Sequence, residues 1–301
     1  MWPSECYNRA RSIGFPLSCS PMSGTLYLVA TPIGNLEDFT FRAVRILGEV
    51  QLIAAEDTRR TAKLLRHYDI TTKSTSLHEH NERPKAPGLV RRLLAGDSIA
   101  LLSDAGTPVI SDPGLILVRQ SLDAGVSVMA LPGPSAVIAA LISSGAPTNS
   151  FTFVGFPPRR SNDRKRWCEA LASEPRTLVF FESPHRLVTT LTMMRESLGN
   201  RMVAVCRELS KLHEELVIRP ISELVEMSVA PRGEYTCVVW PAEGVDLPTQ
   251  RPPEGAVLLK ELTQLTNSGA SRRTAVKEMG RKYGLTTRQM YTAVVRAKEI
   301  G

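Results

Sequence analysis

Short apolar runs alternate, in the first half of the chain, with longer segments in which apolar residues recur every three or four positions. Runs rich in Val, Ile and Leu predict strands at 25–30, 52–55, 99–103 and 127–131. Amphipathic segments beside them predict helices at 39–47, 59–67, 84–95, 115–124 and 134–143. Alternating strands and helices indicate a mostly parallel sheet covered on both faces. We therefore expect an α/β domain here.

The pattern changes after residues 155–161, where two prolines and two arginines indicate a linker. Helices are then predicted at 163–173 and 186–198, and strands at 177–181, 202–206, 214–219 and 234–240. Late strands with little helix between them favour a partly antiparallel sheet of α+β character. Three helices follow at 257–266, 271–282 and 287–300, with Ser271 and Thr286 as N-caps of the last two.

A chain of 301 residues is longer than an average domain, so several domains are expected. The first residues lack the apolar core of a signal peptide, and no apolar stretch is long enough to span a membrane, which predicts a soluble protein. The predicted division is a disordered extension at 1–22, an α/β domain at 23–154, a second domain at 155–241, a linker at 242–253 and a basic helical domain at 254–301.

Charge is concentrated in the last part of the chain. Residues 251–301 hold ten Lys or Arg and four acidic residues, so they carry +6 of the total net charge of +7. A basic tail favours contact with a polyanion, although a solvated helical cap is the alternative. The five cysteines, without a Cys-x-x-Cys pair, predict reduced thiols and a cytosolic location.

Three loops rich in glycine and proline follow predicted strands, at 30–38, 103–114 and 131–136. Glycine allows backbone to approach a ligand closely, and proline stiffens the loop around it. The chain lacks the Gly-x-Gly-x-x-Gly, Walker A and Gly-x-Ser-x-Gly patterns, which weakens ordinary dinucleotide, phosphate-loop and hydrolase interpretations. The three loops therefore predict one shared pocket at the carboxyl ends of parallel strands.

Two polar clusters leave alternatives open. Ala55-Glu-Asp-Thr-Arg59 follows a strand and opens a helix, so its carboxylates either cap that helix or handle a substrate. His78-Glu-His80 has a spacing that suits a metal, a solvated surface or a substrate contact, and no third ligand is evident.

Seven motifs in order resemble those of the bacterial 16S rRNA ribose 2′-O-methyltransferases of the tetrapyrrole methylase superfamily. They are Thr31-Pro-Ile-Gly-Asn-Leu-Glu-Asp38, Ala55-Glu-Asp-Thr-Arg59, His78-Glu-His-Asn81, Ser103-Asp-Ala-Gly-Thr-Pro108, Leu131-Pro-Gly-Pro-Ser135, Glu182-Ser-Pro-His-Arg186 and Arg207-Glu-Leu209. The resemblance covers about residues 24–240 and is weaker in the tail. It implies a two-domain tetrapyrrole-methylase-like fold, with a mostly parallel sheet in the first domain, a mixed sheet in the second and a small C-terminal helical domain.

The resemblance also implies S-adenosylmethionine as cofactor, 16S rRNA or the assembled small ribosomal subunit as partner, and a homodimer. We expect neither a metal, since methyl transfer needs none and no third ligand is evident, nor a membrane, since no apolar run is long enough. The cofactor contacts that it implies are Pro32, Ala105, Gly106, Thr107, Ile110, Ser135, Ala136 and Glu182. Small-molecule members carry Asp where this chain has Thr107, and Asp104 is a nearby carboxylate that takes its place by hypothesis.

The implied reaction is direct methyl transfer to the ribose 2′-hydroxyl of a decoding-centre cytidine. A ribose hydroxyl is a weak nucleophile, so alignment and a carboxylate base are expected to drive the reaction. Asp57 and Glu79 are the candidate bases, and Arg59 and Arg186 the candidate phosphate contacts. Two alternatives remain: a methylase that acts on a small tetrapyrrole, and a non-catalytic RNA-binding factor for ribosome assembly.

Overall fold

The computed structural model describes residues 23–227, 232–242, 255–283, 285 and 287–300. The chain divides into two compact units, residues 1–136 and 137–301. The extension predicted at 1–22, most of the linker predicted at 242–253 and the N-cap predicted at Thr286 lie outside the described residues.

The first unit is built on a five-stranded sheet in which all the strands are parallel, as the sequence predicted. Its order is β3-β2-β4-β1-β5, and the strands are β1 (Thr25–Val29), β2 (Leu52–Ala55), β3 (Ser74–Ser76), β4 (Ile99–Leu102) and β5 (Ser127–Leu131). The sequence missed β3, because its residues Ser-Thr-Ser are few and polar. An edge strand that pairs only with β2 does not need the apolar run of a central strand.

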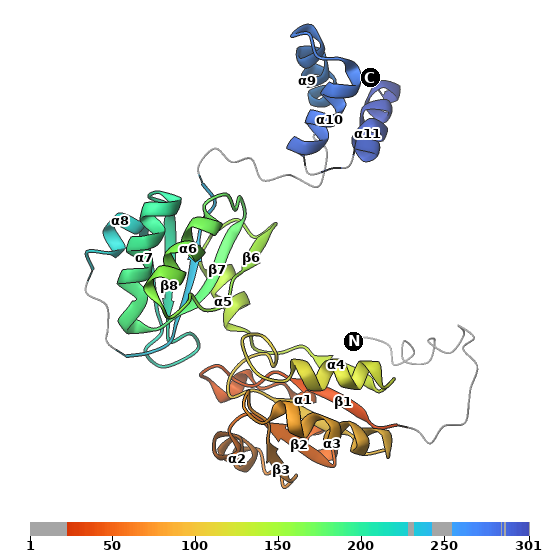
Figure 1. Ribbon diagram of the computed structural model, residues 1–301, viewed down its shortest axis with the longest axis vertical. Helices are drawn as coiled ribbons and strands as arrows, with labels where there is room; N and C mark the ends of the chain where they lie inside the picture. Colours follow the sequence, from red (N-terminus) through yellow and green to blue (C-terminus); the bar gives the residue numbers. More distant parts are fainter. Residues whose placement is uncertain (1–22, 228–231, 243–254, 284, 286, 301) are drawn as a thin grey trace, which may run out of the picture. The chain divides into compact units, whose positions relative to one another are not determined.

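Helices cover both faces of this sheet (Figure 1). One face holds α1 (Phe41–Glu49) and α2 (Thr58–His67), and the other holds α3 (Glu82–Leu94) and α4 (Leu115–Asp123). Successive strand residues alternate between the two cores, so Leu52 and Ala54 pack beneath α3 and α4, whereas Ile53 and Ala55 pack beneath α1 and α2. Both faces are buried, which explains why β2 and β4 are apolar at every position.

The strand order creates a switch point between β1 and β4. These strands are neighbours, but the chain leaves β1 toward β2 on one side and leaves β4 toward β5 on the other. Open α/β sheets bind ligands at the carboxyl edge beside such a point. The predicted ligand loops follow β1, β4 and β5, and therefore all begin at this edge.

A buried carboxylate joins the two helices on one face of the sheet. Glu82, in the first turn of α3, is 5% exposed and accepts hydrogen bonds from the backbone N–H groups of Ile116 (2.7 Å) and Leu117 (3.1 Å). Both amides lie in the first turn of α4, whose N-cap, Gly114, has no side chain to accept them. Glu82 thus caps α4 from outside and places its negative charge at the positive end of the helix dipole.

The second unit contains a mixed five-stranded sheet, which confirms its predicted α+β character. Its order is β6-β7-β10-β8-β9, with only the β6–β7 pair parallel among the described strands. The strands are β6 (Phe151–Phe153), β7 (Thr177–Glu182), β8 (Met202–Arg207), β9 (Glu215–Pro220) and β10 (Tyr235–Val239). The helices around it are α5 (Ala136–Ser143), α6 (Ser161–Leu171), α7 (Pro184–Leu198) and α8 (Ile221–Leu224).

The second unit begins at Val137, earlier than the boundary predicted at residue 155. The strand β6, which the sequence analysis did not predict, pairs with β7 of the second sheet. The helix α5 buries Val137, Ala140 and Leu141 in a core with residues of β7, β8 and β10. An apolar helix can bury its face against either of two sheets, and the sequence does not say which sheet α5 packs on.

The C-terminal residues form three helices, as predicted: α9 (Gly255–Asn267), α10 (Arg272–Lys282) and α11 (Thr287–Ile300). They share a small apolar core that includes Leu258, Leu262, Met279, Met290 and Val294. The predicted N-cap at Ser271 is confirmed, since its hydroxyl accepts a hydrogen bond from the N–H of Thr274 at 3.2 Å. The division of the whole chain into three domains stays a prediction. Among the described residues, no helix combines the length and the apolar character that crossing a bilayer requires.

Replacing Glu82 with alanine tests the cap on α4. The change leaves the amides of Ile116 and Leu117 without their acceptor, and an unsatisfied buried amide costs about 1–3 kcal/mol. We expect the free energy of unfolding in urea to fall by about 2 kcal/mol or more. The control is Arg83→Ala at the exposed neighbouring position, which should change stability by less than about 0.5 kcal/mol. Equal small effects from both variants would contradict the assignment.

Candidate functional site

The loops after β1 and β4 are joined by their backbones at the carboxyl edge of the first sheet. The N–H of Thr31 donates to the carbonyl of Gly106, and the N–H of Gly106 donates to the carbonyl of Thr31, each at 2.9 Å. The buried hydroxyl of Thr31 also donates to the carbonyl of Ser103 at 3.1 Å. The two loops that the sequence singled out separately are therefore one assembly.

The third loop, after β5, is attached to both of the others. The hydroxyl of Thr107 donates to the carbonyl of Pro134 at 3.2 Å. Gly133 lies so close to the first loop that a Cβ atom there would be 2.9 Å from the Cβ of Ala30. An ionised aspartate in place of Thr107 has no proton to donate to that carbonyl. An Asp at position 107 would therefore change how these two loops are joined.

The loop after β4 has an unusual backbone. Gly106 (φ 79°), Val109 (φ 74°), Ser111 (φ 64°) and Gly114 (φ 124°) all have positive φ. A β-branched residue such as Val109 rarely adopts this region, and the strain persists only where surrounding contacts impose it. Glycine is required at position 114, where a Cβ would lie 2.5 Å from Cδ2 of Leu101. The loop after β4 therefore has a backbone conformation that surrounding contacts fix and that differs from an ordinary turn.

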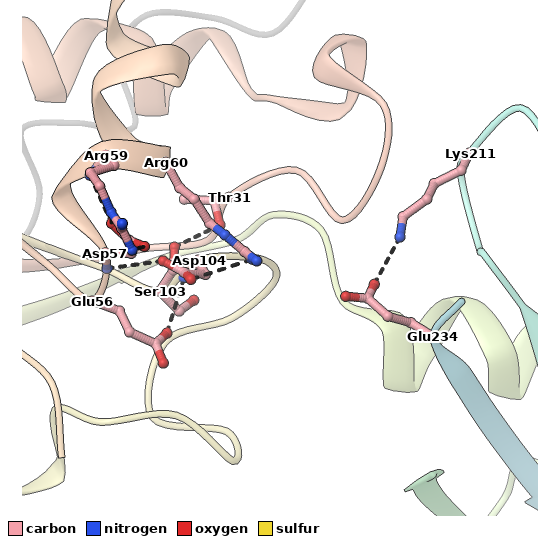
Figure 2. A network of polar contacts seen from close by, with 9 residues as sticks. All are labelled: Thr31, Glu56, Asp57, Arg59, Arg60, Ser103, Asp104, Lys211 and Glu234. Atoms are coloured by element: carbon pink, nitrogen blue, oxygen red, sulfur yellow. Dashed lines mark hydrogen bonds and ion pairs between the residues drawn. The ribbon is translucent and has the colours of Figure 1, made fainter. Parts of the chain in front are cut away.

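Carboxylates that follow β2 and β4 accept hydrogen bonds across the gap between the two strand ends, beside these loops (Figure 2). The N–H of Asp104 donates to Oε2 of Glu56 at 3.2 Å, and the N–H of Asp57 donates to Oδ1 of Asp104 at 3.0 Å. The other oxygen of Asp104 is 3.4 Å from the Arg60 guanidinium. The two strand ends thus exchange side-chain to backbone hydrogen bonds, and these place negative charge at the sheet edge.

A third carboxylate, Asp112, has the most perturbed proton affinity of this group. Burial raises the pKa of Asp112 to about 7, and the nearby negative charges of Glu56 and Asp104 act in the same direction. A hydrogen bond from Ser103 opposes them. Burial is also the main cause that raises the pKa of Glu56. A carboxyl group that titrates near neutral pH is suited to accept a proton under physiological conditions.

The sequence analysis did not select Glu56 or Asp112. Asp112 lies within the loop that it identified, but an Asp before Pro-Gly is ordinary turn composition and gives no sign of burial. Glu56 stands next to Asp57 in the same motif, and spacing alone does not tell which of the two is solvated.

The structure gives Asp57, a predicted base, a capping role. Its Oδ1 accepts from the N–H of Arg59 at 2.8 Å and begins α2. The Arg59 side chain binds the same carboxylate, with Nη2 2.9 Å from Oδ2. These hydrogen bonds from Arg59 lower the pKa of Asp57 to about 2. Such a carboxylate is a weak proton acceptor, so the capping alternative has the stronger structural support, and its role as base stays an untested prediction.

The His78-Glu-His80 segment starts the turn into α3. The N–H of His78 donates to Oδ1 of Asn81 at 2.9 Å, and Nδ2 of Asn81 lies 2.9 Å from Nε2 of His78. Glu79 and His80 are exposed. Across the part of the chain that the structure describes, no group of three or more His, Cys, Asp or Glu side chains is arranged to hold a metal ion. Glu79 stays an untested candidate base.

The predicted cofactor residues lie on two different units. Those of the first unit follow β1, β4 and β5, and are Pro32, Asp104, Ala105, Gly106, Thr107, Ile110, Ser135 and Ala136. Glu182 lies in the second unit, where its buried carboxylate is 2.6 Å from the Arg186 guanidinium and accepts from Ser183 N–H and the Thr190 hydroxyl. Glu182 and Arg186, predicted as a cofactor contact and a phosphate contact, are therefore partners of each other.

The Arg207-Glu-Leu209 motif shapes the loop after β8. Glu208 has φ 51°, and its Oε1 accepts from the N–H of Glu234 at 2.9 Å and from Lys211 Nζ at 3.0 Å. Lys211 also pairs with Oε2 of Glu234 at 2.9 Å, as Figure 2 shows. These contacts give the motif a structural role in the second unit.

Comparison with known proteins places the chain in a family. The family model for tetrapyrrole (corrin/porphyrin) methylases matches residues 25–225. A protein of Halalkalibacterium halodurans named ribosomal RNA small subunit methyltransferase I is 44% identical over 271 residues, which cover 89% of this chain and 93% of that protein. A protein of the same name from Vibrio cholerae is 49% identical over 246 residues, which cover 80% and 84% of the two chains.

Solved structures show the same fold at low identity. A diphthine synthase matches with a TM-score of 0.59 and 13% identity, covering 72% of this chain and 90% of its own. The uroporphyrin-III C-methyltransferase of Thermus thermophilus, complexed with S-adenosylhomocysteine, matches with a TM-score of 0.52 and 21% identity, covering 72% and 97%. With its seven motifs, its joined loops and these matches, the chain belongs to the tetrapyrrole methylase family, in the group of the small-subunit rRNA methyltransferases I.

Proposed function

We propose that this protein transfers the methyl group of S-adenosylmethionine to the ribose 2′-hydroxyl of a cytidine in 16S rRNA. Relatives at 44% and 49% identity are named as methyltransferases of small-subunit ribosomal RNA, which supports that substrate and reaction class. The choice of a ribose oxygen and of a cytidine rests on the motif resemblance alone.

The observation that carries the proposal is the joining of three loops beside three carboxylates at the switch point. The Thr31–Gly106 backbone pair and the Thr107–Pro134 bond fix the loops, while Glu56, Asp104 and Asp112 lie at the same sheet edge. Methyl transfer to a weak nucleophile depends on alignment by a rigid frame and on an acceptor for one proton. This edge offers both.

The chemistry of these residues fits S-adenosylmethionine. The cofactor supplies an electrophilic methyl group on a positively charged sulfonium. Carboxylate oxygens at the ends of β2 and β4 favour a cation at this edge, and the loops present backbone rather than bulky charged side chains. In the proposed site, the cofactor would be held by Pro32, Ala105, Gly106, Thr107, Ile110, Ser135 and Ala136, and Asp104 would supply negative charge.

We propose that the carboxylate of Asp112 is the base that accepts the proton of the 2′-hydroxyl. It is the described carboxylate of this edge whose pKa, at about 7, matches a base at neutral pH. Asp57 binds its proton far more weakly, because Arg59 stabilises its ionised form. Asp112 would accept the proton that the hydroxyl oxygen loses as it takes the methyl group; the C–S bond of the cofactor would break and leave S-adenosylhomocysteine, so charge would not accumulate on the ribose.

Arginine side chains beside this edge are the proposed phosphate contacts. The side chain of Arg59 is 89% exposed and that of Arg60 is 66% exposed, although each pairs with an aspartate. Arg186, in contrast, is held by Glu182 and by the carbonyl of Pro157 at 3.2 Å. The geometry supports Arg59 more strongly than Arg186 as a contact for RNA.

We further infer a cytoplasmic homodimer that needs no metal. The described cysteines Cys168, Cys206 and Cys237 are free thiols, which is typical of proteins in a reducing compartment and supports this location. The homodimer is proposed on the motif resemblance. Sedimentation of the purified full chain tests the dimer.

Mapping methyl groups on rRNA tests the proposed function. We expect mass spectrometry of 16S rRNA to show one ribose-methylated cytidine in cells that contain the protein and an unmodified cytidine in cells that lack it. Purified protein with labelled cofactor should restore the mark on small subunits from the deficient cells. Label that enters a porphyrinoid and never RNA would instead support the small-molecule alternative, and absence of cofactor binding would support the non-catalytic one.

A pH series tests Asp112 as the base. The rate of single-turnover methyl transfer should rise with pH up to about 7 and level off above it, because only the ionised carboxylate accepts a proton. Asp112→Asn should lower the plateau rate by about 10²-fold and remove the inflection. Asp57→Asn and Glu79→Gln serve as matched controls that keep it. A retained inflection in Asp112→Asn, with its loss in either control, would reassign the base.

The stability of the Asp112→Asn variant supplies a second check. The folded-state pKa of Asp112 lies above its ordinary value of 3.8, so ionisation of this group disfavours the fold as pH rises between about 4 and 7. Asparagine removes that cost. The variant should therefore be at least as stable as the parent in urea at pH 8, which separates lost chemistry from lost folding.

A further inference from the structure

The outward face of the last helix combines cations with one exposed aromatic ring. On α11, Met290, Val294 and Ala297 are buried in or beside the core of the helical tail. Arg288, Thr292 and Arg296 recur every four residues on the opposite, exposed side, and Tyr291 lies beside this row, one turn after Arg288 and also exposed. Tyr291 is 55% exposed.

We propose that this face of α11 binds an unpaired segment of RNA, with Tyr291 stacked on a base and with Arg288 and Arg296 on the flanking phosphates. A phenol ring held on a helix loses little conformational entropy when a base stacks on it, and every base offers a π-face. Arg288 lies one turn before the ring, and Arg296 continues the row Arg288-Thr292-Arg296 at four-residue spacing, so positive charge runs along the helix surface beside the ring. The proposal deepens the proposed function and rests on it for the identity of the RNA.

The cations of the tail are not equally available to bind RNA phosphates. Lys282 lies 2.9 Å from Oε1 of Glu261 and stands 5.2 Å from the centre of the Tyr283 ring, and the hydroxyl of that tyrosine bonds the same Glu261. This cation, which the sequence counted with the basic surface, is thus used within the tail. Among the described residues, neither Arg288 nor Arg296 forms an ion pair.

The tail carries a second row of exposed cations, on α10. Arg273, Lys277 and Arg281 recur every four residues, so they lie along one side of the helix, and all three are exposed. A stripe of like charges is unfavourable for the isolated helix by a few tenths of a kcal/mol per pair. Polyanion binding removes this repulsion, whereas an apolar protein partner would have to desolvate the charges. The surface therefore favours RNA over a protein.

The ring is tested by replacing Tyr291 in the full chain. The probe is small ribosomal subunits purified from cells that lack the protein, bound in the presence of S-adenosylhomocysteine. We expect Tyr291→Ala to raise Kd about tenfold and Tyr291→Phe to leave it within about twofold, because stacking needs the ring and not the hydroxyl. Loss of affinity in both variants, or in neither, would overturn the stacking assignment.

The arginines are tested by salt dependence. The slope of log K against log salt concentration should shrink by about 0.7 for each of Arg288→Ala and Arg296→Ala, and should not change for Tyr291→Ala. Lys260→Ala on α9, another exposed cation of the tail, is the matched control and should leave the slope unchanged. Equal changes in the slope for Arg288→Ala, Arg296→Ala and Lys260→Ala would mean that the tail attracts RNA diffusely and has no defined site on α11.

Two further readouts keep this proposal separate from the proposed function. If the parent protein methylates 16S rRNA while Tyr291→Ala binds subunits normally, the α11 proposal fails and the proposed function stands. If subunits are bound through Tyr291 but no cytidine is methylated, the reverse holds. Variants that change the sedimentation of the free protein without changing subunit binding would identify a protein interface, and would also overturn the proposal.

Discussion

The candidate site depends on the pair of backbone hydrogen bonds between Thr31 and Gly106. The strands β1 and β4 are neighbours, but the chain leaves them in opposite directions, so the sheet itself does not hold their loops together. The reciprocal 2.9 Å bonds continue the contact beyond the last paired residues, Val29 and Leu102. They are polar groups that would otherwise end unpaired at a partly buried edge, and leaving them so would cost free energy. The two Thr31–Gly106 hydrogen bonds therefore pair these backbone groups and also hold the ligand loops in a rigid arrangement.

This anchor makes the strain of the next residues tolerable. Gly106 is fixed by Thr31 at one end of the segment, and Gly114 is fixed against Leu101 at the other. Val109 must adopt positive φ between them, at a cost that only such over-determined surroundings sustain. The outcome of this path is the burial of Asp112 near Glu56 and Asp104, which raises its pKa. Backbone geometry at the switch point thus sets the proton affinity of a carboxylate, because it decides how much water reaches the group.

The sequence predicted the parts of this arrangement that local pattern encodes. Buried parallel strands are apolar at every position, loops that expose backbone need glycine and proline, and Ser271 caps a helix through a local bond, so these features were readable. Asp112 was missed because burial depends on contacts between distant residues. Asp57 was preferred for its place in a motif, whereas its low pKa comes from the rotamer of Arg59, which no sequence pattern fixes. The shift of the unit boundary to Val137 has the same origin, since α5 is apolar enough to pack on either sheet.

Positive charge is concentrated in the C-terminal tail, and the proposed reaction gives a physical reason for this separation. In the proposed site, carboxylates that would favour a sulfonium and accept a proton would also repel the phosphates of an RNA substrate, and near a sheet edge that repulsion is only partly screened. Salt screens charges more than about 8 Å apart under physiological conditions, so compensating cations act only where they touch the RNA. A chain of net charge +7 that keeps +6 in residues 251–301 satisfies both demands: the body stays nearly neutral around its carboxylates, and attraction is assigned to the tail. If Asp112 is the base, further arginines beside it, in addition to Arg60 on Asp104, would lower its pKa and weaken it, which is a physical reason to carry most of the positive charge in the tail.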